Sequence, residues 1–276
     1  MTTALVLGGG GITGIAWELG ILAGLAEAGV DLTDADRVIG TSAGSVVGVQ
    51  VTSGTAIGEL YDGQLAPPDA EIGGRLSRLA LLKMLPPFML PGDGRTKLAR
   101  VGKLAMGAHA PGSADREGVI RSRIHTDDWP DRDLRITAVE AESGEFTVFT
   151  RESGVDVVSA VAASCAVPTV WPPVVIGGRH YIDGGMRSTA NVDLAAGADR
   201  VVVLAPLPRA LSRKTSIRAQ LEKVAPRKWT VITPDAEALA AFGKNLLDPA
   251  KRADAARAGQ RQSAALVDEV RHVWGS

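Results

Sequence analysis

The sequence has little that would support a disulfide, a metal site or a membrane span. Its 276 residues include a single cysteine, Cys165, so no disulfide can form within the chain, and a lone thiol is a poor metal site. No run of about 18 to 20 apolar residues occurs, so we expect no spanning helix. The N-terminus lacks the basic segment and the long apolar run of a signal peptide. These absences favour a cytoplasmic protein, with Cys165 as a buried thiol of no chemical role.

The chain also has few aromatic residues and almost no net charge. Aromatic residues make up 4% of the chain, and the formal net charge is −1. Binding to nucleic acid depends on a surplus of basic residues, and base stacking depends on aromatic rings. We therefore expect no nucleic-acid partner, and any affinity for a membrane must come from a local patch.

Glycine, by contrast, is abundant, and four consecutive glycines at residues 8–11 follow a short apolar run. A helical apolar stripe comes next and stops at Gly29, followed by a strand at residues 36–40 and a helix of small residues at 42–54. This order predicts an α/β protein with a parallel sheet. Further strands are expected within residues 133–150, 172–185, 198–206 and 228–235, with a helix within 155–168 and mostly helix from residue 236.

The glycine run has two interpretations. Gly9, Gly11 and Gly14 fit the G-x-G-x-x-G pattern of a dinucleotide-binding loop between a strand and a helix. That pattern also needs an acidic residue at the end of the next strand to hold the ribose. Here the next strand ends in Gly40 and continues into Thr41, and the nearby aspartates precede it. The nucleotide hypothesis therefore lacks its second support.

The segment after that strand reads G-T-S-A-G, which is the G-x-S-x-G pattern of a nucleophile elbow. Gly40 and Gly44 would let the chain reverse sharply and expose the Ser42 hydroxyl. The alternative is a plain helix start that Ser42 or Thr41 caps. Two loops at the same edge of neighbouring parallel strands favour the elbow.

A serine nucleophile needs a base. The histidines are poor candidates, because His272 lies on a charged C-terminal helix and His180 lies on a strand. Asp183 ends a β-segment, and Gly184 and Gly185 would let the chain turn away from its carboxylate. We therefore expect a Ser42–Asp183 dyad.

With that dyad, the glycine run gains a role. Acyl transfer places negative charge on a carbonyl oxygen, and backbone N–H groups stabilise it. Gly9, Gly10 and Gly11 are the candidates for this oxyanion hole, and no metal or other cofactor is needed.

Together the motifs G-G-G-x-x-G, G-x-S-x-G and D-G-G resemble the patatin-like phospholipase family, as does the segment "ASCAVPTVWPPV" before the aspartate. The resemblance covers about residues 4–206. It implies a three-layer α/β/α fold with a mostly parallel central sheet, a serine–aspartate dyad and hydrolysis of lipid acyl esters without a metal. Many members have Arg or Lys where this chain has Thr13, so acyl-ester hydrolysis is better supported than a phospholipid preference.

The chain is expected to form one patatin-like domain, with residues 66–130 as a helical cap insertion and 236–276 as a C-terminal helical extension. Residues 72–107 are basic and apolar with a helical period. They either lie on an anionic membrane surface, such as the inner membrane face, or pack on the sheet as ordinary helices. The sequence also leaves open a patatin-fold lipid-binding or regulatory protein without turnover. It gives no oligomeric state.

Overall fold

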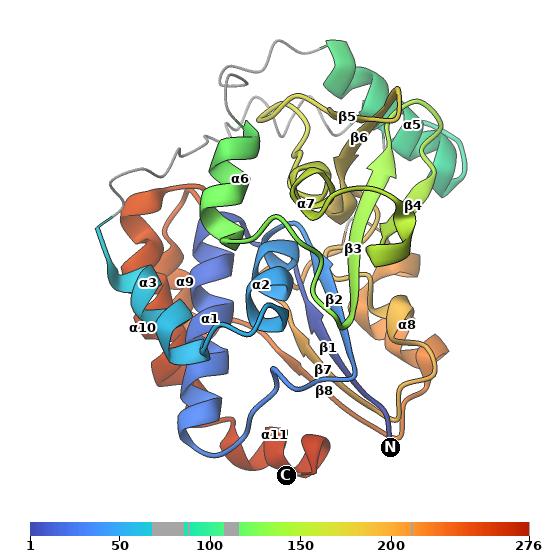
Figure 1. Cartoon of the computed structure of the whole chain (residues 1–276). Coiled ribbons are helices and arrows are strands. Elements are labelled where there is room, and N and C mark those ends of the chain that lie inside the picture. Colours follow the sequence, from blue (N-terminus) through green and yellow to red (C-terminus); the bar gives the residue numbers. More distant parts are fainter. Residues whose placement is uncertain (68–85, 88, 108–115, 211, 276) are drawn as a thin grey trace.

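The computed structural model describes residues 1–67, 86–87, 89–107, 116–210 and 212–275. At its centre, the described residues form an eight-stranded sheet with the order β5-β6-β3-β2-β1-β7-β8, and β4 pairs with β3 outside this path (Figure 1). The strands are β1 (Thr3–Leu7), β2 (Arg37–Thr41), β3 (Asp133–Glu140), β4 (Phe146–Phe149), β5 (Val174–Ile176), β6 (Arg179–Asp183), β7 (Arg200–Leu204) and β8 (Lys228–Ile232).

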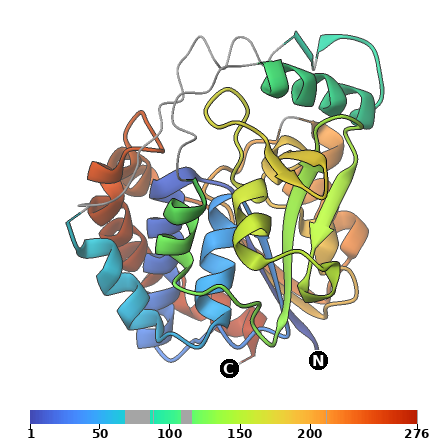
Figure 2. The ribbon, with the colours of Figure 1, turned by 45° about the horizontal axis from the view of Figure 1, so that its top comes forward.

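Helices cover both faces of this sheet, as the two views in Figures 1 and 2 show. The predicted three-layer α/β/α fold is therefore confirmed. The α-helices are α1 (Gly11–Glu27), α2 (Ala43–Thr52), α3 (Ile57–Leu65), α5 (Gly94–Gly107), α6 (Arg116–Ile124), α7 (Val157–Ser164), α8 (Ile217–Val224), α9 (Ala236–Phe242), α10 (Arg252–Ser263) and α11 (Val267–Trp274).

The sequence of the central strand β1 is continuously apolar because both faces of the strand are buried. Leu5 and Leu7 belong to the core beneath α1 and α2, whereas Ala4 and Val6 belong to the core on the opposite face, together with residues of α8. All four side chains are fully buried. A parallel strand covered on both faces needs apolar residues at every position rather than at alternate ones.

The sheet is mixed, and the change of direction occurs at β3. Strands β3, β2, β1, β7 and β8 pair in parallel, whereas β4 and β6 pair with β3 in the antiparallel sense. Residues 136–137 of β3 pair with both β2 and β4, and residues 138–139 pair with both β4 and β6. Because a strand has two edges, β2 and β6 share the edge opposite β4. Figure 1 shows β2 beside the lower part of β3 and β6 beside its upper part.

Of the expected cap insertion at 66–130, residues 68–85, 88 and 108–115 lie outside the described residues, and so does much of the basic segment 72–107. The described helix α5 packs on the sheet. Its residues Leu98, Val101 and Ala105 form a small core with Val139 and Ile182. In the parts of the chain that the structure describes, no helix has the length and apolar character to cross a membrane.

The C-terminal residues from 236 onward join the helical layer on the α1 side. Trp17 of α1 contacts Phe242 edge to face, with ring centroids 6.3 Å apart, and its indole N–H donates to Gln262 Oε1 at 3.0 Å. Residues of α10 and α11 complete the same core. The predicted helical character of this region is confirmed.

Candidate active site

Ser42 lies at a sharp turn between a strand and a helix. It follows the last residue of β2 and is the N-cap of α2, with φ 53° and ψ −116°. Such a positive φ is rare for a residue other than glycine and costs of order 1–3 kcal/mol. The strand–turn–helix context required of a nucleophile elbow is therefore present. The Ser42 residue is 8% exposed.

The two glycines of the G-x-S-x-G motif are explained by close backbone contacts. A Cβ on Gly44 would lie 2.1 Å from the Leu7 carbonyl oxygen, and one on Gly40 would lie 2.6 Å from the Gly44 carbonyl oxygen. The Gly44 N–H also donates to Gly8 O at 3.0 Å. The elbow therefore lies against the end of β1, which leads into the glycine run.

The backbone of Ser42 is held by residues from two other segments. Its N–H donates to Ser164 Oγ at 2.9 Å, and its carbonyl oxygen accepts from Ser45 Oγ at 2.6 Å and from Cys165 Sγ at 3.3 Å. Cys165 is half-buried, so the expectation of a buried thiol is wrong, whereas its lack of a chemical role stays a prediction. Cys165 is the C-cap of α7, and its hydrogen bond to Ser42 O joins the end of this helix to the elbow. The sequence signal was its place in "ASCAVP", directly after Ser164.

Asp183 is the last residue of β6, and the register of the sheet places it next to the elbow. Thr41, the residue before Ser42, pairs with Thr137, and Asp183 pairs with the next residue of β3, Ala138. Since β2 and β6 share one edge of β3, their C-terminal ends meet head to head. Consecutive residues of a strand are about 3.4 Å apart along its axis. The register thus brings the elbow and the end of β6 together.

The carboxyl group of Asp183 is buried and part of a tight turn. The residue is 2% exposed, and its Oδ1 accepts from the Gly185 N–H at 2.7 Å. Gly184 begins a short 3-10 helix, η2 (Gly184–Met186), and a Cβ at this position would lie 2.4 Å from Thr137 Oγ1. The D-G-G motif is therefore a turn packed tightly against β3.

The glycine run lies against Ser42 from the other side. A Cβ on Gly9 would contact the Cβ of Ser42 at 3.5 Å. The Gly9 N–H, however, donates to Thr189 O at 2.8 Å, so this amide is already used within the protein. Gly10 is the N-cap of α1, and Gly11 is its first residue. Amides at these positions have no partner inside a helix. Of the three candidates for an oxyanion hole, the geometry favours Gly10 and Gly11.

The C-terminal region closes over the start of α1. A Cβ on Gly11 would lie 2.7 Å from Leu246 O and 2.9 Å from Leu247 Cδ2. The same Leu246 carbonyl accepts from the Thr13 N–H at 3.1 Å, and Thr13 is fully buried. Gly14 is likewise part of the first turns of α1. The position that carries a basic residue in many patatin-like proteins is therefore enclosed here.

One buried carboxyl group lies beneath the loop. Glu18 is fully buried in α1, and its Oε1 accepts from the Gly8 N–H at 2.9 Å. Burial raises the pKa of Glu18 well above its ordinary value, although the bond from Gly8 lowers it. Among the described residues, its Oε2 has no hydrogen-bond partner. Glu18 therefore supports the glycine loop from within the core, through its hydrogen bond to the Gly8 N–H.

His180 lies on a strand and His272 on a helix, as the sequence predicted. His180 is half-buried near the start of β6, with Nδ1 2.5 Å from Glu142 Oε1, and His272 lies on α11. Within the described residues, no group of three or more His, Cys, Asp or Glu side chains has the arrangement of a metal site.

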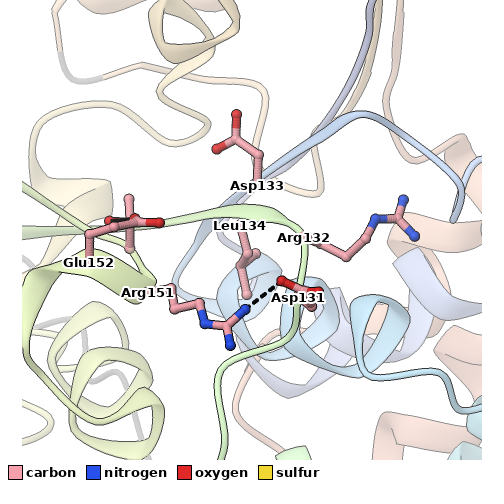
Figure 3. A pocket seen from close by; sticks show the side chains of 7 residues that line it. Asp131, Arg132, Asp133, Leu134, Arg151 and Glu152 are labelled. Carbon is pink, nitrogen blue, oxygen red and sulfur yellow. Dashed lines mark hydrogen bonds and ion pairs between the residues drawn. The ribbon is translucent and has the colours of Figure 1, made fainter.

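A separate cavity of about 330 Å³ lies near the start of β3 and is lined by charged residues (Figure 3). Arg151 Nη1 lies 2.5 Å from Asp131 Oδ1, and Asp133 bonds to Arg37 and Arg135. These charges neutralise one another. Ser42 lies beyond the opposite end of β2, so this cavity is not part of the candidate site.

Comparison with known proteins gives one family. The family model described as "Patatin-like phospholipase" matches residues 5–196. No curated protein sequence matches the chain. Among solved structures, VipD from Legionella pneumophila is similar with a TM-score of 0.49 and 14% identity, over 97% of this chain and 66% of that one. The type III effector ExoU gives 0.44 and 16% identity, over 98% and 53%. This chain thus spans about half to two thirds of the chains it matches.

Proposed function

Because the chain belongs to the patatin-like phospholipase family, we propose that it is a serine acyl hydrolase that cleaves lipid esters with Ser42 and Asp183. The observation that carries the proposal is the register of β3, which joins the end of β2 to the end of β6. The positive φ of Ser42 is a second support, since a strained serine between a strand and a helix is the local structure of an elbow nucleophile.

In the proposed reaction, Asp183 accepts the proton of the Ser42 hydroxyl while Ser42 Oγ attacks the carbonyl carbon of an ester. The negative charge that develops on the carbonyl oxygen is stabilised by the amides of Gly10 and Gly11 and by the positive end of α1. The alcohol then leaves with the proton from Asp183. Water attacks the acyl-enzyme with Asp183 as base, Ser42 Oγ leaves and takes back that proton from Asp183, and a fatty acid is released.

The test is hydrolysis of p-nitrophenyl acyl esters by three purified proteins. Wild type should turn over, Ser42→Ala should lose all turnover, and Asp183→Asn should lose nearly all of it. The melting temperatures of the variants should stay close to that of wild type. Retained activity in either folded variant would reject the role of that residue.

Two other classes of function give different results. A lipid-binding or regulatory protein without turnover would fail to react at Ser42 with a serine-directed fluorophosphonate, whereas the proposed hydrolase should label there. A dinucleotide-binding protein would gain thermal stability with NAD. The strand β2 ends in Gly40 and Thr41, without the acidic residue that would hold a ribose, which argues against a bound dinucleotide.

We propose further that residues 66–130 act as a cap on a single domain and attach it peripherally to anionic lipid. The described part offers exposed Met89, Leu90 and Met106 together with the exposed Lys103 of α5. Apolar and basic side chains on one segment are the combination that binds membrane interfaces. Sedimentation with phosphatidylglycerol vesicles should fall after Lys103→Glu combined with Leu90→Ser, while a vesicle of phosphatidylcholine alone should bind little of either protein. Equal sedimentation of both proteins with the anionic vesicles would exclude this attachment.

A further inference from the structure

Asn191 is a fully buried polar residue that touches both halves of the candidate site. Its Nδ2 lies 3.0 Å from Thr41 Oγ1 and 3.4 Å from the carbonyl oxygen of Gly184. Thr41 directly precedes Ser42, and Gly184 directly follows Asp183. One side-chain amide therefore joins the elbow of the nucleophile to the turn of the base.

Two further contacts complete the surroundings of this amide. Nδ2 lies 3.0 Å from Ser188 O and 3.3 Å from Thr137 Oγ1, and the Thr137 hydroxyl itself donates to Thr41 Oγ1 at 3.0 Å. An amide nitrogen has two hydrogens, which these four acceptors share. Thr137 is the β3 residue that pairs with Thr41, so the network spans the point where the two strand ends meet.

The asparagine is itself held in place from its other side. Its Oδ1 accepts from Arg187 Nη1 at 2.7 Å, and Arg187 is anchored by an ion pair to Asp193. Its backbone N–H donates to Ser188 Oγ at 3.2 Å. The backbone at Asn191 is left-handed, with φ 50° and ψ 45°, a conformation that asparagine tolerates better than most residues. The amide is therefore fixed before any substrate binds.

From this geometry we propose that Asn191 is a positioning residue, which holds the turn of Ser42 and the turn of Asp183 in the alignment needed for proton transfer. The proposal rests on the proposed hydrolase function. Apolar packing alone would bury the strand ends without fixing their mutual distance, because dispersion contacts have little directional preference. Hydrogen bonds to residues adjacent to both reacting groups fix that distance. Displacements of about 1 Å in such a site lower turnover by up to about 100-fold.

The test compares kcat and KM for p-nitrophenyl ester hydrolysis in a set of variants. Asn191→Gly removes the amide and keeps the left-handed backbone accessible. Thr137→Val removes one hydroxyl of the network and retains the side-chain shape. Tyr61→Phe serves as the control, because it removes a 2.6 Å hydrogen bond to Gln260 Oε1 between α3 and α10, away from the site.

We expect Asn191→Gly to lower kcat by about 10- to 100-fold with KM within about twofold of wild type. Thr137→Val should lower kcat by about fivefold, the effect of one ordinary hydrogen bond. Tyr61→Phe should lower the melting temperature and leave kcat unchanged. All rates are measured well below the melting temperature of each variant, and labelling of Ser42 by a fluorophosphonate should slow in the same order as kcat.

The outcomes separate this inference from the function on which it rests. If wild type hydrolyses the ester through Ser42 and the kcat of both network variants is within twofold of wild type, the positioning role is wrong and the hydrolase stands. If kcat falls in Tyr61→Phe as much as in Asn191→Gly, the effect is one of stability and the inference is also wrong. If Ser42→Ala is as active as wild type, both fail. Should Asn191→Gly not fold, Thr137→Val decides alone.

Discussion

The buried Glu18 should make the stability of this protein fall as the pH rises. Its pKa is raised by burial well above the ordinary value of 4.5, so the folded protein keeps a proton that the unfolded chain releases above about that pH. Folding then takes up a proton, and the free energy of unfolding decreases by up to about 1.4 kcal/mol for each pH unit. The decrease continues until the pH passes the pKa of the folded state.

Glu18→Gln removes this dependence with little change of shape. The glutamine oxygen can accept from the Gly8 N–H as Oε1 does, and its NH2 group takes the place of Oε2, which has no partner among the described residues. Relative to wild type, the variant should therefore gain up to about 1.4 kcal/mol for each pH unit above about 4.5. In a chain of this size, that is about 2–4 °C in melting temperature per unit.

The assay is urea unfolding of wild type and Glu18→Gln at pH 5, 6, 7 and 8, followed by circular dichroism. Glu237→Gln is the control, since it makes the same substitution at an exposed glutamate that pairs with Arg261. If the stability of wild type and of Glu18→Gln changes in parallel over this range, Glu18 does not hold a proton in the folded state, and the reasoning fails.

Three further predictions concern the elbow and the glycine loop. Ser42→Gly should abolish ester hydrolysis and raise the free energy of unfolding by about 1 kcal/mol, because glycine relieves the strain at φ 53°; an unfolding free energy at or below that of wild type would contradict this. Gly44→Ala should destabilise the protein by more than about 3 kcal/mol in urea unfolding, since the new methyl group would lie 2.1 Å from Leu7 O. Thr13→Lys should cost about 2–5 kcal/mol, because it places a charge in a fully buried position; a Thr13→Val control should cost much less, and equal losses would show that size rather than charge is responsible.

Much of the fold could be predicted because its signals are local. The strand–glycine–helix order of the first 54 residues, the Ser143–Gly144 turn and the helical C-terminal region follow from apolar periodicity and turn residues. Both loops were expected at one edge of parallel strands, and both are there. The head-to-head meeting of β2 and β6 could not be predicted in this way, because apolar periodicity indicates where strands lie in the sequence but not which strands pair.

The details of the site depend on contacts between distant residues. Gly9 was a candidate for the oxyanion hole because glycine exposes its amide, but Thr189, 180 residues further along, accepts that hydrogen bond. The closure over Gly11 comes from Leu246, and the support of Ser42 comes from Ser164 and Cys165. None of these partners is marked by a spacing or a motif of its own. Asn191 has no sequence signal at all, because its left-handed backbone is defined only by the folded loop.

If Ser42 and Asp183 act together as proposed, the meeting of β2 and β6 on one edge of β3 determines when the site becomes complete during folding. The elbow belongs to a parallel unit assembled mostly from the first 55 residues, whereas the carboxylate comes from an antiparallel unit more than 100 residues later. A chain that has assembled only the early unit carries the serine without its partner. Pairings of such high sequence separation form late, because closing long loops costs entropy before the contacts compensate. Regained secondary structure should therefore precede regained turnover when the protein is refolded.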